Sequence, residues 1–264
     1  MKLTILFCLF LLAMSVMAQL PAPNAAGATA GHEIFSAKDQ AAANRFWTAL
    51  GGEPATLVRL NLIKFPGELL LVGGQRNANG GGGTEGSSVD YIAFKVKNLK
   101  DTVAKVVEAG ARALPGATAS QAFVMAPDDI KVRLREDRTL ATPVAADGLG
   151  MVVTDVAAAQ AWYAQWFGGK TMKTAAGEMV SEIPGSNLYF TENKTPMAPT
   201  AGRAFGRIGM EVKGLETFCK KLEESGVTLI NKYTKAGNMD LAICAFNDPW
   251  GTQIEVSEGL AAVK

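Results

Sequence analysis

The chain has 264 residues, which is enough for one large domain or two small ones. Hydrophobic residues make up 48% and charged residues 19%, a balance typical of a globular protein with a core. Its 26 basic and 25 acidic residues leave a net charge of +1, so neither nucleic acid nor an anionic membrane is expected as a partner, because both attract strongly basic surfaces.

The first eighteen residues are typical of a secretory signal peptide. Lys2 provides a positive start, 3–16 is almost wholly apolar, and small residues around Ala18 suit cleavage. The apolar stretch is short for a membrane span, although an uncleaved anchor is the alternative. We therefore predict a signal peptide over 1–18 and an exported protein, either periplasmic or secreted. Residues 19–30 are rich in Ala, Pro and Gly and predict a flexible leader.

Internal repetition organises the rest of the chain. The segment 39–43 (Asp-Gln-Ala-Ala-Ala) recurs at 155–159 as Asp-Val-Ala-Ala-Ala, an offset of 116 residues (155 − 39). The segment 99–110 corresponds to 215–226 at the same offset. The sequence therefore predicts a duplication.

Each half contains the same order of elements. In the first, Ile92, Phe94 and Val96 alternate along a strand, and apolar residues then recur at helical spacing up to Gly110. A strand, a turn and a second strand follow. The second half repeats this order. The expected elements are strand 88–96, helix 99–109 and hairpin 123–134, then strand 207–212, helix 215–225 and hairpin 241–256.

This order predicts an α+β fold of four units, each with a strand, a helix and about three strands. One unit cannot bury its sheet alone, but two units can close a curved sheet with helices outside and a cavity within. We expect two half-barrel lobes of two βαβββ units each, one at 31–140 and one at 145–260.

Two segments carry a family resemblance. Val-Val-Thr-Asp at 152–155 leads into Trp162-Tyr163 and Phe-Gly-Gly at 167–169, and 247–255 reads Asn-Asp-Pro-Trp-Gly-Thr-Gln-Ile-Glu. Together with the four βαβββ units, they resemble the vicinal oxygen chelate superfamily, which includes glyoxalases, bleomycin resistance proteins and extradiol dioxygenases. The resemblance covers nearly the whole chain after the leader and implies the fold more strongly than any activity.

The resemblance implies metal ligands on the first and last strands of paired units. His32 and Glu255 fall on such positions, but Arg133 and Arg207 stand where other ligands would be needed. The chain has one histidine, which excludes a two-His-one-carboxylate iron site and a three-His zinc site. Arginine keeps its proton and cannot ligate a cation. We therefore expect no metal cofactor. The alternative is a divalent metal at Glu255 or His32 in a metal-dependent glyoxalase (a lyase) or an extradiol dioxygenase-like enzyme.

Strand alternation places polar side chains in the expected first cavity. Its lining would contain His32, Tyr91, Lys95, Lys131 and Arg133, a cationic set that suits a carboxylate or another oxyanion. The alternative is that the lysines extend to solvent while Arg133 pairs with an acid such as Asp90.

The expected second cavity is polar as well. Arg207, Glu211, Gln253 and Glu255 would share an inner face with Tyr189 nearby, and Glu255 would be a possible general base. The alternative is an internal ion pair between Arg207 and Glu255 that fills the site.

We therefore predict an exported protein that binds a small molecule, with acidic molecules among the candidates, in a barrel cavity. A homodimer is possible. Cys219 and Cys244 leave two interpretations open, a disulfide in an oxidising compartment or two small core residues.

Overall fold

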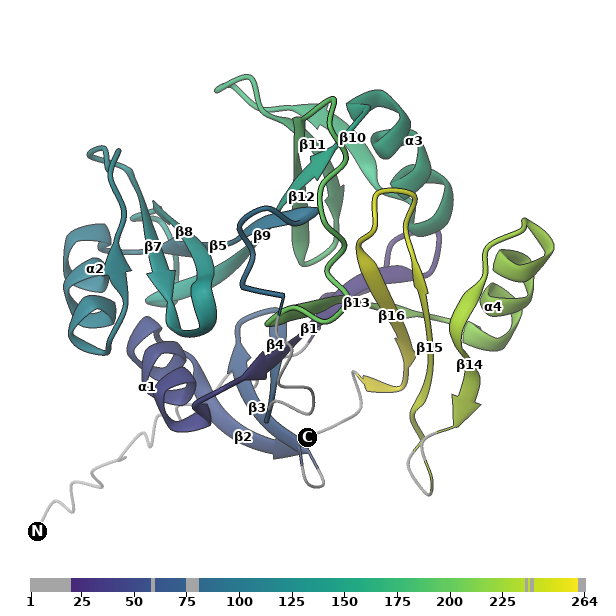
Figure 1. The fold of residues 1–264 in the computed structure, drawn as a ribbon, viewed down its shortest axis with the longest axis horizontal. Coiled ribbons are helices and arrows are strands. Elements are labelled where there is room, and N and C mark those ends of the chain that lie inside the picture. The colour runs from purple at the N-terminus through teal and green to yellow at the C-terminus, as the bar shows by residue number, and fades with distance from the viewer. Residues whose placement is uncertain (1–19, 58–59, 75–80, 236, 238–239, 261–264) are drawn as a thin grey trace, which may run out of the picture.

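The computed structural model describes residues 20–57, 60–74, 81–235, 237 and 240–260 (Figure 1). The predicted signal peptide at 1–18 lies outside these residues. None of the helices in the described ranges is long and apolar enough to cross a membrane. The elements, in chain order, are β1 (Ala28–Ala37), α1 (Gln40–Leu50), β2 (Glu53–Leu57), β3 (Leu60–Phe65), β4 (Glu68–Gly74), β5 (Val89–Val96), α2 (Leu99–Glu108), β6 (Arg112–Ala113), β7 (Gln121–Ala126), a 3-10 turn η1 (Pro127–Asp129), β8 (Ile130–Glu136), β9 (Val144–Val153), α3 (Val156–Phe167), β10 (Lys170–Lys173), β11 (Met179–Ile183), β12 (Ser186–Glu192), β13 (Phe205–Val212), α4 (Leu215–Glu224), β14 (Leu229–Lys235), β15 (Ala242–Asn247) and β16 (Gln253–Glu258).

The predicted α+β fold of four βαβββ units is confirmed, because a strand, a helix and three strands recur four times along the chain. The repeated sequence motif at the start of each half caps a helix. The side chains of Asp39 and Asp155 each accept a hydrogen bond from the backbone amide three residues later, at 2.9 Å in both cases. Such an acceptor satisfies an amide group that the first helical turn leaves unpaired. The helices α1 and α3 end at Gly51 and Gly168, both in the left-handed conformation.

The units pair differently from our expectation. One eight-stranded sheet, here called sheet I, has the order β14-β15-β16-β13-β1-β4-β3-β2 and combines the first unit with the fourth. The other, sheet II, has the order β10-β11-β12-β9-β5-β8-β7-β6 and combines the second unit with the third. The prediction that 31–140 and 145–260 each build a separate lobe is therefore wrong in this respect.

The reason lies in the connections between the units. The second unit joins the third through the short segment 137–143, and β5 pairs with β9 in antiparallel orientation. The first and fourth units are left to meet through β1 and β13, which also pair antiparallel. Repetition along the sequence identifies the units. It does not predict which units pair, because the first strand of every unit (the leading strand: β1, β5, β9 or β13) has an equivalent free edge.

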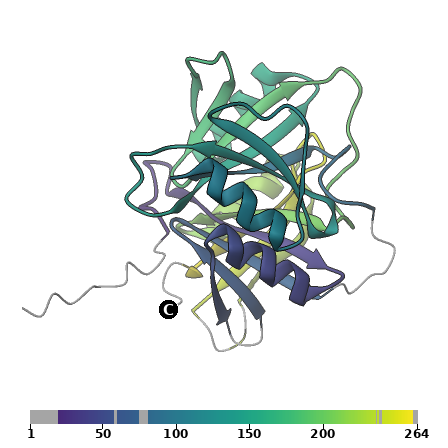
Figure 2. The same cartoon turned by 90° about the vertical axis from the view of Figure 1, so that its left-hand side faces the viewer.

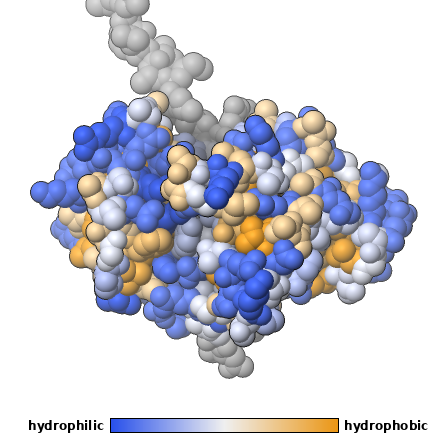
Figure 3. Space-filling view, turned by 90° about the horizontal axis from the view of Figure 1, so that it is seen from above, coloured by the Kyte–Doolittle hydropathy of each residue, from blue (hydrophilic) through white to orange (hydrophobic). Residues whose placement is uncertain are grey.

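A single large core lies between the helices and the sheets. Ile92, Phe94 and Val96 are all 0% exposed in it, which agrees with the predicted alternation. The helices α1 and α2 come from units in different sheets and lie side by side (Figure 2). A smaller cluster of leucines, Leu62, Leu69 and Leu260 with Leu20, covers part of sheet I. On the face seen from above, hydrophobic residues form small separate patches among hydrophilic ones (Figure 3).

The segment predicted as a flexible leader is packed from residue 20 onward, so that prediction is wrong for 20–30. The strand β1 already begins at Ala28. The side chain of Asn24 donates a hydrogen bond to the carbonyl of Phe167 at 2.8 Å, which satisfies an acceptor at the end of α3. Leu20 packs against the leucine cluster. Composition alone did not reveal these two contacts.

Both cysteines of the globular part are free and buried. Cys219 lies on α4 and Cys244 on β15, and each thiol is close enough to shift the pKa of the other. Of the two interpretations that the sequence left open, the structure has the pair of small core thiols.

Two glutamates lie buried together on adjacent strands of sheet I. Glu33 of β1 is 3% exposed and Glu68 of β4 is 5% exposed, and the two carboxyl groups lie close enough for each to affect the pKa of the other. Burial raises the pKa of Glu33 well above its ordinary value, and the neighbouring charge of Glu68 raises it further. A proton on Glu33 can then be donated to the Glu68 carboxylate. Loss of that proton would place two unscreened charges in the core.

Replacement of Glu33 by glutamine tests this pair. A carboxyl group whose pKa is raised by folding contributes stability below its unfolded pKa and loses that contribution as pH rises through its folded pKa. Glu33→Gln keeps a donor toward Glu68 and cannot ionise. It should therefore raise the free energy of unfolding by about 1–3 kcal/mol at pH 8, and by much less at pH 4. Denaturant unfolding at both pH values measures this. Glu53→Gln, at an exposed position of the same sheet, is the control. A gain that is equal at the two pH values would contradict the prediction.

Candidate anion-binding site

The central strand pair of each sheet is interrupted by two bulges. In sheet II, the register of β5 and β9 leaves Asp90 and Asp147 without a cross-strand partner. In sheet I, the register of β1 and β13 leaves Gly31 and Gly206 in the equivalent positions, at the offset of the sequence repeat. A bulge bends its strand and redirects the side chain of the extra residue. The two sheets therefore share one backbone plan, and only sheet II carries carboxylates on it.

An aromatic ring lies over a cross-strand glycine in each sheet. Tyr91 pairs with Gly150 in sheet II, and His32 pairs with Gly209 in sheet I. A Cβ atom added to Gly150 would come within 2.2 Å of the Tyr91 ring, and one added to Gly209 within 2.4 Å of Nδ1 of His32. The absence of a side chain at these two glycines thus allows each ring to lie flat on the sheet.

Sheet II carries a cluster of charged and aromatic side chains, which we call the arginine cluster. It combines residues from β5, β8, β9 and β12 with one residue from the turn between β10 and β11. Its members are Tyr91, Lys95, Arg133, Arg135, Asp147, Glu178 and Tyr189.

Asp147 is the fixed anion of the arginine cluster. Its side chain is 0% exposed. It accepts hydrogen bonds from Nη2 of Arg135 at 2.8 Å and from the hydroxyl of Tyr189 at 2.9 Å. The ammonium group of Lys95 lies 3.7 Å from it. A buried carboxylate needs such partners, because desolvation without them is costly.

Glu178 is the second anion, and it is partly exposed, at 28%. Its two oxygens bridge the two arginines. Nη1 of Arg133 donates to Oε1 at 2.8 Å, and Nη1 of Arg135 donates to Oε2 at 3.1 Å. Each guanidinium group thus uses one nitrogen to hold the same carboxylate.

Arg133 has an unpartnered edge. Its side chain is 3% exposed, and its guanidinium carbon lies 4.0 Å from the ring centroid of Tyr189 and 4.7 Å from that of Tyr91. Its Nε and Nη2 make no hydrogen bond with any described residue, although Nη2 lies 3.5 Å from Asp147. An unmet buried donor costs about 1–3 kcal/mol. The Nε–Nη2 edge is one that can bind a carboxylate through two parallel hydrogen bonds.

Both tyrosines keep their protons over the physiological range. Burial raises the pKa of Tyr91 to about 12, against the opposing charge of Arg133. Burial raises the pKa of Tyr189 as well, and the neighbouring Asp147 carboxylate raises it further. Each hydroxyl is therefore both a donor and an acceptor. The cluster has three cationic and two anionic side chains, a net excess of one positive charge.

Sheet I carries a smaller set, which we call the histidine cluster: His32, Arg207, Gln253 and Glu255. Nε2 of His32 lies 3.2 Å from Oε1 of Glu255, and Nη1 of Arg207 donates to Oε2 at 2.6 Å. Burial alone would raise the pKa of Glu255, but the hydrogen bonds from His32 and Arg207 outweigh it and hold the pKa below its ordinary value. Glu255 is thus a stable carboxylate and a weak base. The ion pair between Arg207 and Glu255, the alternative considered from the sequence, is present.

The histidine cluster does not fit a divalent metal. One oxygen of Glu255 faces His32, while the guanidinium of Arg207 takes the other. The partner of His32 on β4 is Leu69, which offers no donor atom. Within the described ranges, no group of three or more His, Cys, Asp or Glu side chains is arranged to hold a metal ion. A cation here would have to compete with a fixed positive charge for its ligand.

The predicted site residues divide between the two clusters. Tyr91, Lys95, Arg133 and Tyr189 lie in the arginine cluster, and His32, Arg207 and Glu255 lie in the histidine cluster. Two placements were wrong. His32 does not join the residues of its own half, and Tyr189 does not lie near Arg207, because the units are exchanged between the sheets.

Lys131 belongs to neither cluster. Its ammonium group pairs with Asp90 at 2.9 Å and lies 5.2 Å from the ring centroid of Phe123. Both acidic bulge residues of sheet II therefore neutralise basic side chains of β8. The alternative drawn from the sequence was right about Asp90 as a partner, but the partner of Asp90 is Lys131 and not Arg133.

Three members of the arginine cluster were missed. Arg135 could have been found, because it follows Lys131 and Arg133 at the two-residue spacing of one strand face. Asp147 sits in a bulge, where alternation fails. Glu178 comes from the end of a turn, and no periodic signal marks it.

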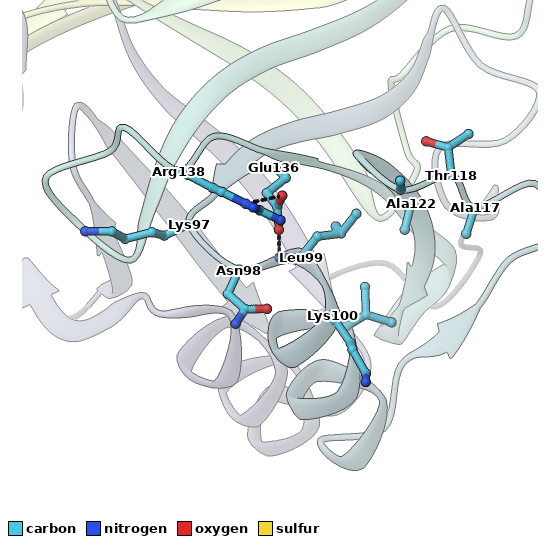
Figure 4. Close-up of a pocket in the computed structure, with 11 residues that line it drawn as sticks. Lys97, Asn98, Leu99, Lys100, Ala117, Thr118, Ala122, Glu136 and Arg138 are labelled. Carbon is cyan, nitrogen blue, oxygen red and sulfur yellow. Dashed lines mark hydrogen bonds and ion pairs between the residues drawn. The ribbon is translucent and has the colours of Figure 1, made fainter.

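A surface cavity among the described residues lies elsewhere. It measures about 810 Å³ and opens beside the start of α2, between Lys97, Lys100 and Arg138 (Figure 4). The carboxylate of Glu136 already occupies the start of the helix, since it accepts hydrogen bonds from the amide of Leu99 and from Arg138. This cavity shares no residue with either cluster.

The comparisons with known proteins agree with this fold. Residues 145–256 match the family described as Glyoxalase/Bleomycin resistance protein/Dioxygenase superfamily. The crystal structure of glyoxalase I from Zea mays has a TM-score of 0.70 at 12% identity, covering 89% of this chain and 94% of that one. A putative dioxygenase from Bacillus subtilis subsp. subtilis str. 168 has a TM-score of 0.60 at 11% identity, covering 92% of this chain and 86% of that one. No curated protein matches the sequence.

At such low identities these structures establish the fold and not the chemistry. Taken with the four βαβββ units, the comparisons lead to one conclusion: the chain has the fold of glyoxalase I, and its residues 145–256 match the glyoxalase/bleomycin resistance protein/dioxygenase superfamily.

Proposed function

We propose that this protein binds a small carboxylate at the arginine cluster of sheet II, without a metal cofactor. The single observation that carries the proposal is the unpartnered Nε–Nη2 edge of Arg133, buried between two tyrosine rings. Folded proteins seldom bury donors without acceptors, and such an exception calls for a specific explanation. A ligand carboxylate would supply the two acceptors that the edge lacks.

The surroundings of Arg133 support an anion and not a cation. The cluster keeps one positive charge in excess when Asp147 and Glu178 are both ionised. The hydroxyl of Tyr91 already accepts a hydrogen bond from Nη1 of Arg133 at 2.8 Å, so its proton is free to be donated to a ligand oxygen. Stacking between the rings fixes the plane of the guanidinium group, which reduces the entropy lost on binding.

The histidine cluster has no comparable pair of unpartnered guanidinium donors among the described residues. Its arginine is already paired with Glu255 at 2.6 Å and with Gln253 at 3.1 Å. The neighbouring leucine cluster covers part of the same sheet. We therefore assign ligand binding to sheet II, and we propose that His32, Arg207 and Glu255 stabilise sheet I without catalysis.

Arg133→Met tests the proposed site. Methionine fills much of the same volume between the tyrosine rings but has no hydrogen-bond donor. It should abolish binding of small carboxylates such as butyrate, a loss of at least about 100-fold in affinity for a bidentate charged contact. Isothermal titration calorimetry on the full chain measures it, with circular dichroism as the check of folding. Arg138→Met removes an equal charge from an exposed position, 81% exposed, and should bind as the wild type does. Equal affinity in the two variants would refute the proposal.

The metal-free state is tested at the histidine cluster. Protein purified without chelators should contain far less than one equivalent of zinc, nickel, iron or manganese by mass spectrometry, because Arg207 competes for Glu255. Arg207→His removes that charge and adds a nitrogen donor beside His32 and Glu255. It should acquire a thermal shift with Zn²⁺ that the wild type lacks. Stoichiometric metal in the wild type that is lost in Glu255→Gln would instead favour the metal-dependent alternative.

A further inference from the structure

The carboxylate of Glu178 occupies the arginine cluster in the way a ligand would. It is held by one nitrogen of Arg133 at 2.8 Å and one of Arg135 at 3.1 Å. It is the only member of the cluster that does not come from the interior of a strand, since it lies in the turn between β10 and β11. Its side chain is 28% exposed, whereas that of Asp147 is 0% exposed.

The segment that carries Glu178 lies at the edge of sheet II, and the backbone amide of Glu178 donates to the hydroxyl of Thr174 in the same turn at 3.1 Å. The strand β10 is the edge of sheet II, pairs with β11 alone and is exposed along its whole length. The turn itself contains Gly177 in the left-handed region, with φ +86°. Edge segments with few buried contacts open at low free-energy cost. Glu178 can therefore leave the arginines while sheet II stays intact.

Asp147 cannot be displaced in the same way. The hydroxyl of Tyr189 and two nitrogens of Arg135 donate to its side chain, and Asn187 donates to its backbone carbonyl at 3.0 Å. It sits on the central strand β9. Removal of Glu178 from the cluster would leave Lys95, Arg133 and Arg135 against this single carboxylate, a surplus of two positive charges.

We infer that Glu178 is an internal ligand of the site and that a small dicarboxylate displaces it. This inference rests on the proposed function. One carboxylate of the incoming molecule would bind the Nε–Nη2 edge of Arg133, and the other would replace Glu178 at the two Nη1 atoms. Both positions are then filled, and two negative charges meet the surplus of two positive charges. A monocarboxylate can fill the first position with Glu178 still in place.

Glu178→Gln separates these two modes. The amide keeps the shape of the side chain and removes its charge, so the competition for the two Nη1 atoms falls. Succinate should bind this variant about tenfold more tightly than it binds the wild type. Butyrate, of the same chain length with one carboxylate, should change much less. Calorimetry on the full chain measures both ligands. Glu182→Gln, an exposed glutamate on the adjoining strand β11, should change neither affinity.

A second measurement does not depend on the variant. Amide hydrogen exchange of 174–178 in the wild type should become faster with saturating succinate and stay unchanged with butyrate, since only the dicarboxylate releases the turn.

The two proposals fail in different ways. If succinate binds the wild type but Glu178→Gln binds it no more tightly and the exchange of the turn is unaltered, the internal-ligand inference is wrong and the carboxylate site stands. If neither succinate nor butyrate binds either protein, and the folding of both is confirmed by circular dichroism, the carboxylate site itself is wrong and the inference falls with it.

Discussion

The antiparallel pairing of leading strands, β1 with β13 and β5 with β9, is the constraint on which the rest of the structure depends. It joins units from opposite halves of the chain into each sheet. The same pairing contains the bulges and the cross-strand glycines. These decide which side chains lie flat on the sheet and which turn toward neighbouring side chains.

The two sheets share this backbone, so their different chemistry comes from different residues at a few equivalent positions. Glycines stand at the bulges of sheet I, where the histidine cluster has one carboxylate, Glu255, between a histidine and an arginine. At the equivalent positions of sheet II, two aspartates form ion pairs with basic residues of β8: Asp90 with Lys131 and Asp147 with Arg135.

The charged side chains of sheet II need hydrogen-bond partners because they are largely buried. A guanidinium group enclosed by aromatic rings has little water to solvate it, so each of its nitrogens needs an acceptor from the protein or from a ligand. Arg135 has all the acceptors it needs within the cluster, whereas Arg133 has acceptors on only one side. In the histidine cluster of sheet I, Arg207 and Glu255 are paired with each other, and leucines cover part of the same sheet. The contrast explains why one face of a duplicated fold is suited to binding and the other to stability.

Much of the fold could be predicted from the sequence, because repetition, helix caps and strand alternation are local properties. Asp39, Asp155 and Gly110 mark helix ends through hydrogen bonds within a few residues, and Phe94 and its neighbours show the buried face of β5 directly. The membership of the clusters was harder to predict. His32 and Tyr189 were assigned to the wrong companions because pairing between units is set by long-range contacts. Asp147 lies in a bulge and Glu178 at the end of a turn, and at neither place do side chains alternate between the two faces of a sheet. Arg135 could have been predicted by the same strand alternation that identified Arg133, because the two lie two residues apart on β8.

The exchange of units also orders the assembly of the protein. Sheet II is made from units that are adjacent in the chain and joined by a short link, so its long-range contacts span modest separations. Sheet I needs β1 and β16, which lie near opposite ends of the described chain, and closing so long a loop is slow. The edge of β1 that pairs with β13 therefore has no partner until the fourth unit has been synthesised, whereas the second and third units can pair earlier. On this topology we expect sheet II to form before sheet I, whose surface includes the packed Leu20 and Leu260.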